Sequence, residues 1–184
     1  MSMSASEVVH FMFIPLKPNT FIYKHIIMIN LLYTYPETIV DGEGIRYSIY
    51  LAGCTHKCKG CHNPESWNPK AGSPFTEEKL NQIIEEINSN PLLDGVTFSG
   101  GDPFFNPEEF GEILKEVKTR TGMNIWCYTG YTLEEIMADE RREPLLHYID
   151  ILVDGKFDEK LYSPTLEFRG SSNQRIIKIS SVIG

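Results

Sequence analysis

Residues Cys54 to His62 read Cys-Thr-His-Lys-Cys-Lys-Gly-Cys-His, and this stretch places three cysteines in the spacing C-x3-C-x2-C. A loop this short brings three sulfurs to one point without help from distant parts of the chain. Thiolates are the ligands of iron–sulfur clusters and of zinc. The stretch therefore predicts a metal centre whose protein ligands are Cys54, Cys58 and Cys61.

The number of cysteines separates several kinds of site. A four-iron cluster needs four ligands, so three cysteines leave one iron open to a small molecule. A structural zinc site also needs four ligands, usually as two pairs, and only His56 or His62 could complete it here. A disulfide framework needs an even set of cysteines and an oxidising compartment, whereas the fourth cysteine, Cys127, lies far away in the sequence. The pattern favours an iron–sulfur cluster, with zinc as the alternative.

Length and charge narrow the function classes. The chain has 184 residues and a net charge of −8, which fits one globular domain. An acidic chain is a poor match for nucleic acid or for anionic membranes. No apolar run reaches the roughly 18 residues that a spanning helix needs. Because the start of the chain lacks a basic region, we expect no signal peptide, and clustered cysteines then indicate a reducing cytoplasm.

The first 27 residues differ from the remainder, because apolar patches there are interrupted by Pro15 and Pro18. We expect residues 1–27 to be a poorly ordered extension and residues 28–184 to form the folded domain. An additional edge strand is the alternative for the extension.

The folded part alternates strands and helices. Strands are predicted over residues 45–52, 95–99, 124–128, 149–153 and 175–179. One helix is expected from Thr76 to Ser89, and a second from Pro107 to Thr121 with Asn106 as its N-cap and Glu109 as its capping-box partner. Thr132 opens a third, short helix with its own capping box. This order predicts an α/β fold, a partial (βα) barrel with a curved and mostly parallel sheet; a flat doubly wound sheet is the alternative.

Four unusual loops each follow the C-terminal end of a predicted strand. They are the cysteine loop, Gly100-Gly101-Asp102-Pro103, Thr129-Gly130-Tyr131 and Asp154-Gly155-Lys156. Ligands bind at that end of the strands in parallel α/β folds, so the four loops should form one active site. The glycine pair allows a ligand to approach the backbone closely, and Asp102 adds a negative charge that could hold an ammonium group. Cys127 lies in the middle of a strand and is expected to be a small buried hydrophobe.

The spacing C-x3-C-x2-C followed by a Gly-Gly-acid turn resembles the radical S-adenosylmethionine superfamily. Within it, the chain resembles the activating enzymes of anaerobic ribonucleoside-triphosphate reductases. The segments that carry this resemblance are residues 39–46, 53–63, 66–67, 98–103, 126–131, 152–157 and 169–174. They cover most of the chain after residue 28. Gly60 departs from the wider superfamily, which usually has an aromatic residue before the third cysteine.

The resemblance implies a mechanism and a set of site residues. Cys54, Cys58 and Cys61 would hold a [4Fe–4S] cluster whose open iron binds the amino and carboxylate groups of S-adenosyl-L-methionine. Gly100, Gly101 and Asp102 would line the methionine part of this cofactor, and Gly60, Cys61 and His62 would lie against it. Reductive cleavage would yield a 5′-deoxyadenosyl radical, which abstracts hydrogen from a glycine of the reductase.

The resemblance also implies partners and leaves rival functions open. The protein substrate would be anaerobic ribonucleoside-triphosphate reductase, and the electron would come from an external donor such as flavodoxin. A pyruvate formate-lyase activator or a deazaguanine synthase would be another radical enzyme of this superfamily. An electron carrier is a further alternative and would need Cys127 as its fourth ligand. A zinc-stabilised binding module is the last.

Overall fold

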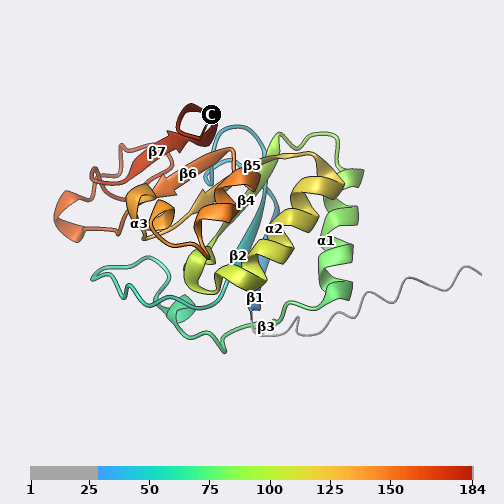
Figure 1. Cartoon of the computed structure of the whole chain (residues 1–184), viewed down its shortest axis with the longest axis horizontal. Helices are drawn as coiled ribbons and strands as arrows, with labels where there is room; N and C mark the ends of the chain where they lie inside the picture. Colours follow the sequence, from blue (N-terminus) through green and yellow to red (C-terminus); the bar gives the residue numbers. More distant parts are fainter. Residues whose placement is uncertain (1–28, 184) are drawn as a thin grey trace, which may run out of the picture.

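The computed structural model describes residues 29–183, which form one mixed sheet with helices packed against it (Figure 1). The strand order is β3-β1-β2-β4-β5-β6-β7. The strands are β1 (Asn30–Thr38), β2 (Arg46–Leu51), β3 (Ser73–Pro74), β4 (Gly95–Gly100), β5 (Asn124–Tyr128), β6 (Ile151–Asp154) and β7 (Arg175–Lys178). The expected extension, residues 1–27, lies outside the described residues.

Four neighbouring strands at the centre are parallel, and the outer strands are antiparallel. β2, β4, β5 and β6 pair in parallel, whereas β1 and β7 run antiparallel to β2 and β6. The predicted α/β class and parallel centre are therefore confirmed. The sheet is open between its edge strands β3 and β7, so it forms no barrel.

The helices begin and end where the sequence predicts. α1 (Glu77–Ser89) is capped by Thr76 and buries its expected apolar stripe of Leu80, Ile83, Ile84 and Ile87. α2 (Pro107–Thr121) ends at Gly122, whose φ of 66° is the left-handed conformation that glycine adopts most easily. α3 (Leu133–Met137) has the capping box predicted for Thr132 and Glu135. Short 3₁₀ helices fill several connections, η1 (Pro64–Trp67), η2 (Pro103–Phe105), η3 (Glu143–Tyr148), η4 (Glu159–Leu161) and η5 (Ile179–Ser181).

Three local features differ from the expectations. β1 was not predicted as a strand, and β7 is antiparallel because the chain returns beside β6 without a helical crossover. The side chain of Asn106 makes no capping hydrogen bond, so the predicted capping box of α2 is wrong. The backbone of Asn106 also ends η2, which leaves Pro107 as the feature that opens the helix.

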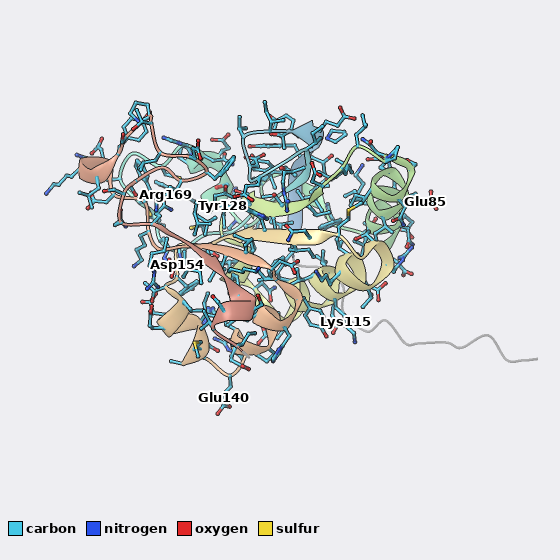
Figure 2. All side chains as sticks on the ribbon, turned by 90° about the horizontal axis from the view of Figure 1, so that it is seen from above. Glu85, Lys115, Tyr128, Glu140, Asp154 and Arg169 are labelled. Atoms are coloured by element: carbon cyan, nitrogen blue, oxygen red, sulfur yellow. The ribbon has the colours of Figure 1, made fainter. Side chains whose placement is uncertain are left out.

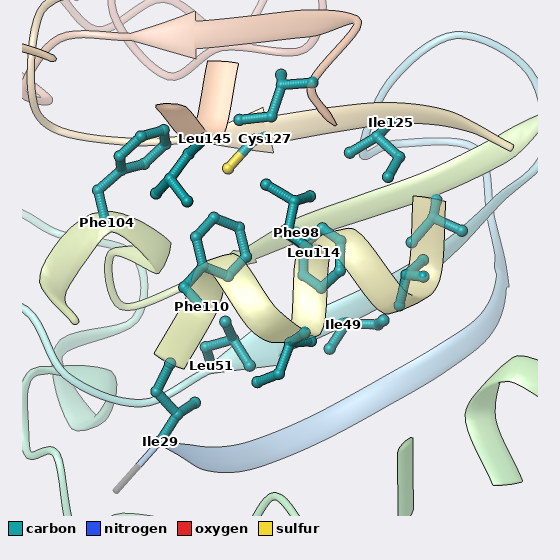
Figure 3. Close-up of a cluster of buried hydrophobic side chains, with 14 of the residues drawn as sticks. Ile29, Ile49, Leu51, Phe98, Phe104, Phe110, Leu114, Ile125, Cys127 and Leu145 are labelled. Atoms are coloured by element: carbon teal, nitrogen blue, oxygen red, sulfur yellow. The ribbon is translucent and has the colours of Figure 1, made fainter. Parts of the chain in front are cut away.

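The two faces of the sheet have different chemistry. Alternate residues of each central strand point to opposite faces. On the helix side, Ile49, Phe98 and Cys127 belong to the main core with α2 (Figure 3). The opposite face carries polar and aromatic groups, including Tyr50, Ser99 and Tyr128, which line a cavity. The strand alternation thus separates a dry core from a functional face. No helix among residues 29–183 is both long and apolar enough to span a bilayer.

Candidate functional site

The cysteine loop begins where β2 ends. Gly53 turns the chain with a φ of 105°, and a Cβ atom there would lie 2.5 Å from the ring of Phe105. The backbone N–H of Gly53 donates to the carbonyl of Ser66 over 2.8 Å, and that of Cys54 donates to the carbonyl of Trp67 over 3.3 Å. These bonds tie both ends of the loop together, so its cysteines stay beside the end of the parallel sheet.

The three clustered cysteines are free thiols on one cavity. Cys54, Cys58 and Cys61 are each half-buried, and all three line a cavity of about 590 Å³. Burial raises the pKa of the Cys54 thiol, and hydrogen bonding from the backbone of His56 partly opposes this. Burial also raises the pKa of the Cys58 thiol, against hydrogen bonding from the backbone of Phe157. Such backbone donors suit sulfur atoms that carry negative charge.

The predicted loops meet at this cavity. Gly100, Gly101, Thr129, Gly130 and Gly155 line it together with the cysteines. They follow β4, β5 and β6, so the expectation that the four loops share one rim agrees with their positions. The predicted residues Gly60 and Asp102 are not among the lining residues, whereas His62 is.

Asp102 holds three loops together from behind the cavity. Its side chain is buried, and its carboxylate accepts hydrogen bonds from His56 Nε2 at 2.7 Å, Thr129 Oγ1 at 2.9 Å and the Gly130 N–H at 3.0 Å. It also accepts a bond from the Phe104 N–H. Protein groups thus surround a carboxylate that the sequence assigned to the cofactor. Its role toward a cofactor stays a prediction.

His56 and Gly130 make the contact between two of these loops very close. A Cβ atom on Gly130 would lie 2.4 Å from the His56 ring, and the His56 ring lies edge-on to Tyr131 with centroids 4.5 Å apart. The guanidinium carbon of Arg142 lies over the Tyr131 ring, 4.3 Å from its centroid. The Thr129-Gly130-Tyr131 segment therefore packs directly against the cysteine loop and fixes the position of His56.

The segment after β6 covers the cysteine loop from outside. The Phe157 ring lies 5.3 Å from that of His62, and a Cβ atom placed on Gly60 would lie 3.4 Å from the same ring. Lys59 forms an ion pair with Glu159 at 2.9 Å. Asp154 is buried and pairs with Arg175, while Lys156 is exposed, so the two charged residues of the Asp154-Gly155-Lys156 loop do not pair with each other.

Charged groups that the sequence analysis did not assign lie on the other side of the cavity. The Tyr50 hydroxyl donates to both carboxylate oxygens of Asp41 at 2.9 Å. Burial is the main cause that raises the pKa of Tyr50, and the negative charge of Asp41 is the second. Arg169 donates from Nη1 to the carbonyl of Gln174 at 3.0 Å. Its buried Nε finds no acceptor among residues 29–183. Figure 2 labels Arg169 and Tyr128 in the same part of the molecule. Both Asp41 and Arg169 stand in segments of the resemblance, but spacing alone assigns them no partner.

Buried Arg46 holds the turn that carries Asp41. It donates from Nε to Thr97 Oγ1 at 2.9 Å and from Nη1 to the Glu43 carbonyl at 3.3 Å, and Thr97 in turn donates to the Asp41 carbonyl at 2.8 Å. Burial lowers the pKa of Arg46 to about 10. A buried arginine that bonds mainly to neutral groups fixes the Asp-Gly-Glu-Gly turn at the cavity.

Three free cysteines that line one cavity are a donor set suited to an iron–sulfur cluster. Among the described residues, no three His, Cys, Asp or Glu side chains are placed to hold one ion. In an iron–sulfur cubane each cysteine binds a different iron. Cys127 is fully buried on the helix-facing side of β5, as predicted, and does not line the cavity.

Comparisons with known proteins agree with this chemistry. Residues 40–177 match the model of a 4Fe-4S single cluster domain. Three relatives are named anaerobic ribonucleoside-triphosphate reductase-activating protein. That of Pasteurella multocida is 40% identical over 82% of this chain and 98% of its own length. That of Escherichia coli K12 is 41% identical over 76% of this chain and 92% of its own, and that of phage T4 is 37% identical over 77% and 89%. The chain belongs to the family of anaerobic ribonucleoside-triphosphate reductase-activating proteins.

Proposed function

We propose that the protein is a radical S-adenosylmethionine enzyme that installs a glycyl radical on anaerobic ribonucleoside-triphosphate reductase. The observation that carries this proposal is the ligand count at the cavity. Cys54, Cys58 and Cys61 share it with the Gly-Gly turn, while Cys127 lies on the opposite face of the sheet. In a [4Fe–4S] cluster held by three cysteines, the fourth iron has no cysteine ligand and is free to bind a small molecule.

The cluster, when bound and reduced, would supply the electron that splits S-adenosylmethionine into methionine and the 5′-deoxyadenosyl radical that takes hydrogen from glycine. The protein's own part is to hold and orient both reactants. Burial raises the pKa of the Cys54 and Cys58 thiols overall, and the backbone groups of His56 and Phe157 only partly offset this effect. The buried carboxylate of Asp102 keeps the loop in place through His56.

The Gly-Gly turn makes room for the cofactor. A Cβ atom on Gly100 would lie 2.4 Å from the Leu51 carbonyl oxygen, and one on Gly101 would lie 2.4 Å from the Gly53 carbonyl oxygen. Only glycines let this turn lie so close to the start of the cysteine loop. The turn lines the cavity, where it would bind the methionine part of S-adenosylmethionine with His62 beside it.

Two charged side chains suit the polar groups of the same molecule. Arg169 offers a buried donor without an acceptor in the described chain, which fits a carboxylate. Asp41 accepts hydrogen bonds from Tyr50 on the cavity wall and could accept others from hydroxyl or ammonium groups. Asp41 and Arg169 thus add an acidic and a basic group to the cavity from segments that are distant in sequence from the cysteines.

The partner would present its glycine at the open side of the cavity. Exposed apolar side chains lie around it, since Tyr33, Val40 and Tyr162 line the cavity and are 37%, 71% and 50% exposed. Such a rim suits contact with a protein. We propose the reductase as this partner, in line with the names of the relatives.

One anaerobic experiment tests the proposed reaction. The protein is reconstituted with iron and sulfide, reduced with dithionite and mixed with S-adenosylmethionine, and 5′-deoxyadenosine is measured by chromatography. We expect the nucleoside from the wild type and from Cys127→Ala, and none from Cys58→Ala. No nucleoside from the wild type, or zinc in place of iron, would refute the proposal.

A second measurement separates the rival radical enzymes. Addition of the reductase should give a glycyl radical signal in electron paramagnetic resonance, and a reductase variant lacking that glycine should give none. A pyruvate formate-lyase activator or a deazaguanine synthase would form 5′-deoxyadenosine with its own substrate but leave the reductase without a radical.

A further inference from the structure

Four lysines surround the outer side of the cysteine loop in an otherwise acidic protein. They are Lys57, Lys59, Lys156 and Lys160, all of them exposed. The segments 57–59 and 156–160 hold these four against two carboxylates, Asp158 and Glu159, whereas the remainder of the chain has 13 basic and 23 acidic side chains. The sign of the local charge is therefore reversed where the cysteines approach the surface.

Three of the lysines share a hollow that borders the cysteine cavity. Lys59, Lys156 and Lys160 line a depression of about 410 Å³, whose other lining residues are Phe157, Asp158, Glu159 and Asn173. Phe157 also lines the large cavity, so it forms a wall between the hollow and the cysteines. Lys59, which lines the hollow, directly follows Cys58 in the sequence. The hollow thus lies one residue away from a ligand sulfur.

Several polar groups of the hollow are already bonded within the protein. Asn173 donates to the carbonyl of Lys156 at 2.8 Å, and Asp158 accepts a bond from the backbone of Lys160 at 2.9 Å. The carboxylate of Glu159 is already engaged by Lys59, and Asp158 caps η4. Lys156 and Lys160 have no carboxylate partner among the described residues and keep their charge for another molecule.

Two reactants need access to the same cysteines. The cofactor and the glycine of the protein substrate would occupy the cavity side, so an electron must enter by another face. We propose that the Lys59–Lys156–Lys160 hollow is the docking surface for the electron donor, a small acidic one-electron carrier protein. This inference rests on the proposed function and adds a partner surface to it. One electron leaves the reduced carrier and enters the group held by the cysteines, so the carrier is oxidised by one electron with no change in bonds or protons.

Charge reversal of the hollow tests the inference. The double variant Lys156→Glu/Lys160→Glu is compared with Lys115→Glu/Lys178→Glu, which makes the same change in charge elsewhere. Lys115 is exposed on α2 (Figure 2). Lys178 pairs with Ile151, at the opposite end of β6 from the rim. Reduction of the reconstituted protein by a reduced, acidic flavodoxin is followed anaerobically through the loss of visible absorbance.

The hollow variant should be reduced by flavodoxin about tenfold more slowly or worse at low ionic strength, because charged surfaces steer association by such factors. The control variant should stay within about twofold of the wild type. The wild-type rate should itself fall as salt is raised toward 0.5 M, because salt screens the attraction. Equal flavodoxin rates in both double variants, or a wild-type rate that is insensitive to salt, would overturn the inference.

Dithionite separates docking from other effects. As a small reductant it needs no docking surface, so it should reduce both double variants at the wild-type rate. Slow reduction of the hollow variant by dithionite as well would overturn the inference, because the substitutions would then act on the metal centre itself. A normal flavodoxin rate combined with weaker reductase binding would assign the hollow to the protein substrate instead. Failure of the proposed function gives a different result, which is normal reduction but no 5′-deoxyadenosine from dithionite-reduced wild type.

Discussion

At the scale of single residues, Arg169 leads to a prediction about the affinity for S-adenosylmethionine. Its Nε is buried without an acceptor in the described chain, so a ligand carboxylate would gain a charge-assisted hydrogen bond. Arg169→Gln should weaken S-adenosylmethionine binding by roughly 10- to 100-fold, since bonds to charged groups contribute about 1.5–3 kcal/mol. Binding is measured anaerobically on the reconstituted protein by equilibrium dialysis with labelled cofactor.

The matched control for this change is Arg141→Gln. Arg141 is exposed and pairs with Glu108 and Asp139 outside the cavity, so cofactor affinity should not change. Equal dissociation constants for wild type and Arg169→Gln would remove Arg169 from the binding site.

Cys127 makes a prediction about pH. Burial raises the pKa of its thiol well above the usual 9. In the unfolded chain the thiol ionises near pH 9 while in the folded chain it stays neutral, so unfolding releases a proton and stability falls as pH rises above that value. Urea unfolding of the metal-free protein at pH 7.5 and pH 10 should show a smaller alkaline loss for Cys127→Ala than for the wild type.

The same variant has a cost at neutral pH. Removing a buried sulfur leaves a small cavity, which should lower the free energy of unfolding by about 1 kcal/mol at pH 7.5. The remaining alkaline loss would come from other groups whose pKa is raised by burial, among them Tyr47 and Tyr128. Parallel stability curves for wild type and Cys127→Ala would show that this thiol does not contribute.

At the scale of elements, the joint between the cysteine loop and the loop after β5 is the most sensitive contact. Gly130→Ala would place a Cβ atom 2.4 Å from the His56 ring, so the cysteine loop must shift. Iron that stays bound through gel filtration should fall by about twofold or more, because overpacked sites displace their neighbours. Iron is measured per chain after identical reconstitution.

Gly122→Ala provides the comparison for that experiment. Gly122 has a φ of 66° and nothing within 4 Å of its Cβ position, so an alanine there is strained but makes no clash. It should lower stability by about 1 kcal/mol while iron content stays at the wild-type level. Equal iron loss in both variants would attribute the effect to general destabilisation and not to the loop contact.

At the scale of the whole molecule, the core of the sheet and the cysteine loop should unfold as separate units of stability. The core of α1, α2 and the central strands contains no predicted ligand, whereas the cysteine loop depends on short tethers at its ends. Removing iron with a chelator should lower the melting temperature, since metal binding contributes to folding. Hydrogen exchange should lose protection mainly in residues 53–63 and 155–162.

Helix α2 supplies the reference within the same experiment. It packs against the opposite face of the sheet from the cavity (Figure 3), so its amides should keep their protection without iron. Uniform loss of protection over the whole chain would contradict this division.

The cysteine spacing, the helices and the central strands could be read from the sequence because they rest on local patterns. Four apolar positions of α1 recur at helical spacing, and the C-x3-C-x2-C loop needs no distant residue to assemble. That the loops share one rim could also be predicted from the sequence, because parallel strands end at the same edge of a sheet. The antiparallel outer strands did not follow, since strand pairing depends on contacts distant in sequence.

Tertiary structure decided which side chains meet. Asp102 stands 46 positions from His56, and the sequence cannot show that its carboxylate turns toward that ring and away from the cavity. Likewise Arg169 reaches the cavity, and Lys156 and Lys160 reach the cysteine loop, only because the chain returns past β6. The sequence by itself predicted the cysteine ligands and determined the α/β class, through short-range spacing and periodicity. The partners of those ligands came from packing, because each depends on long-range contacts that no local pattern records.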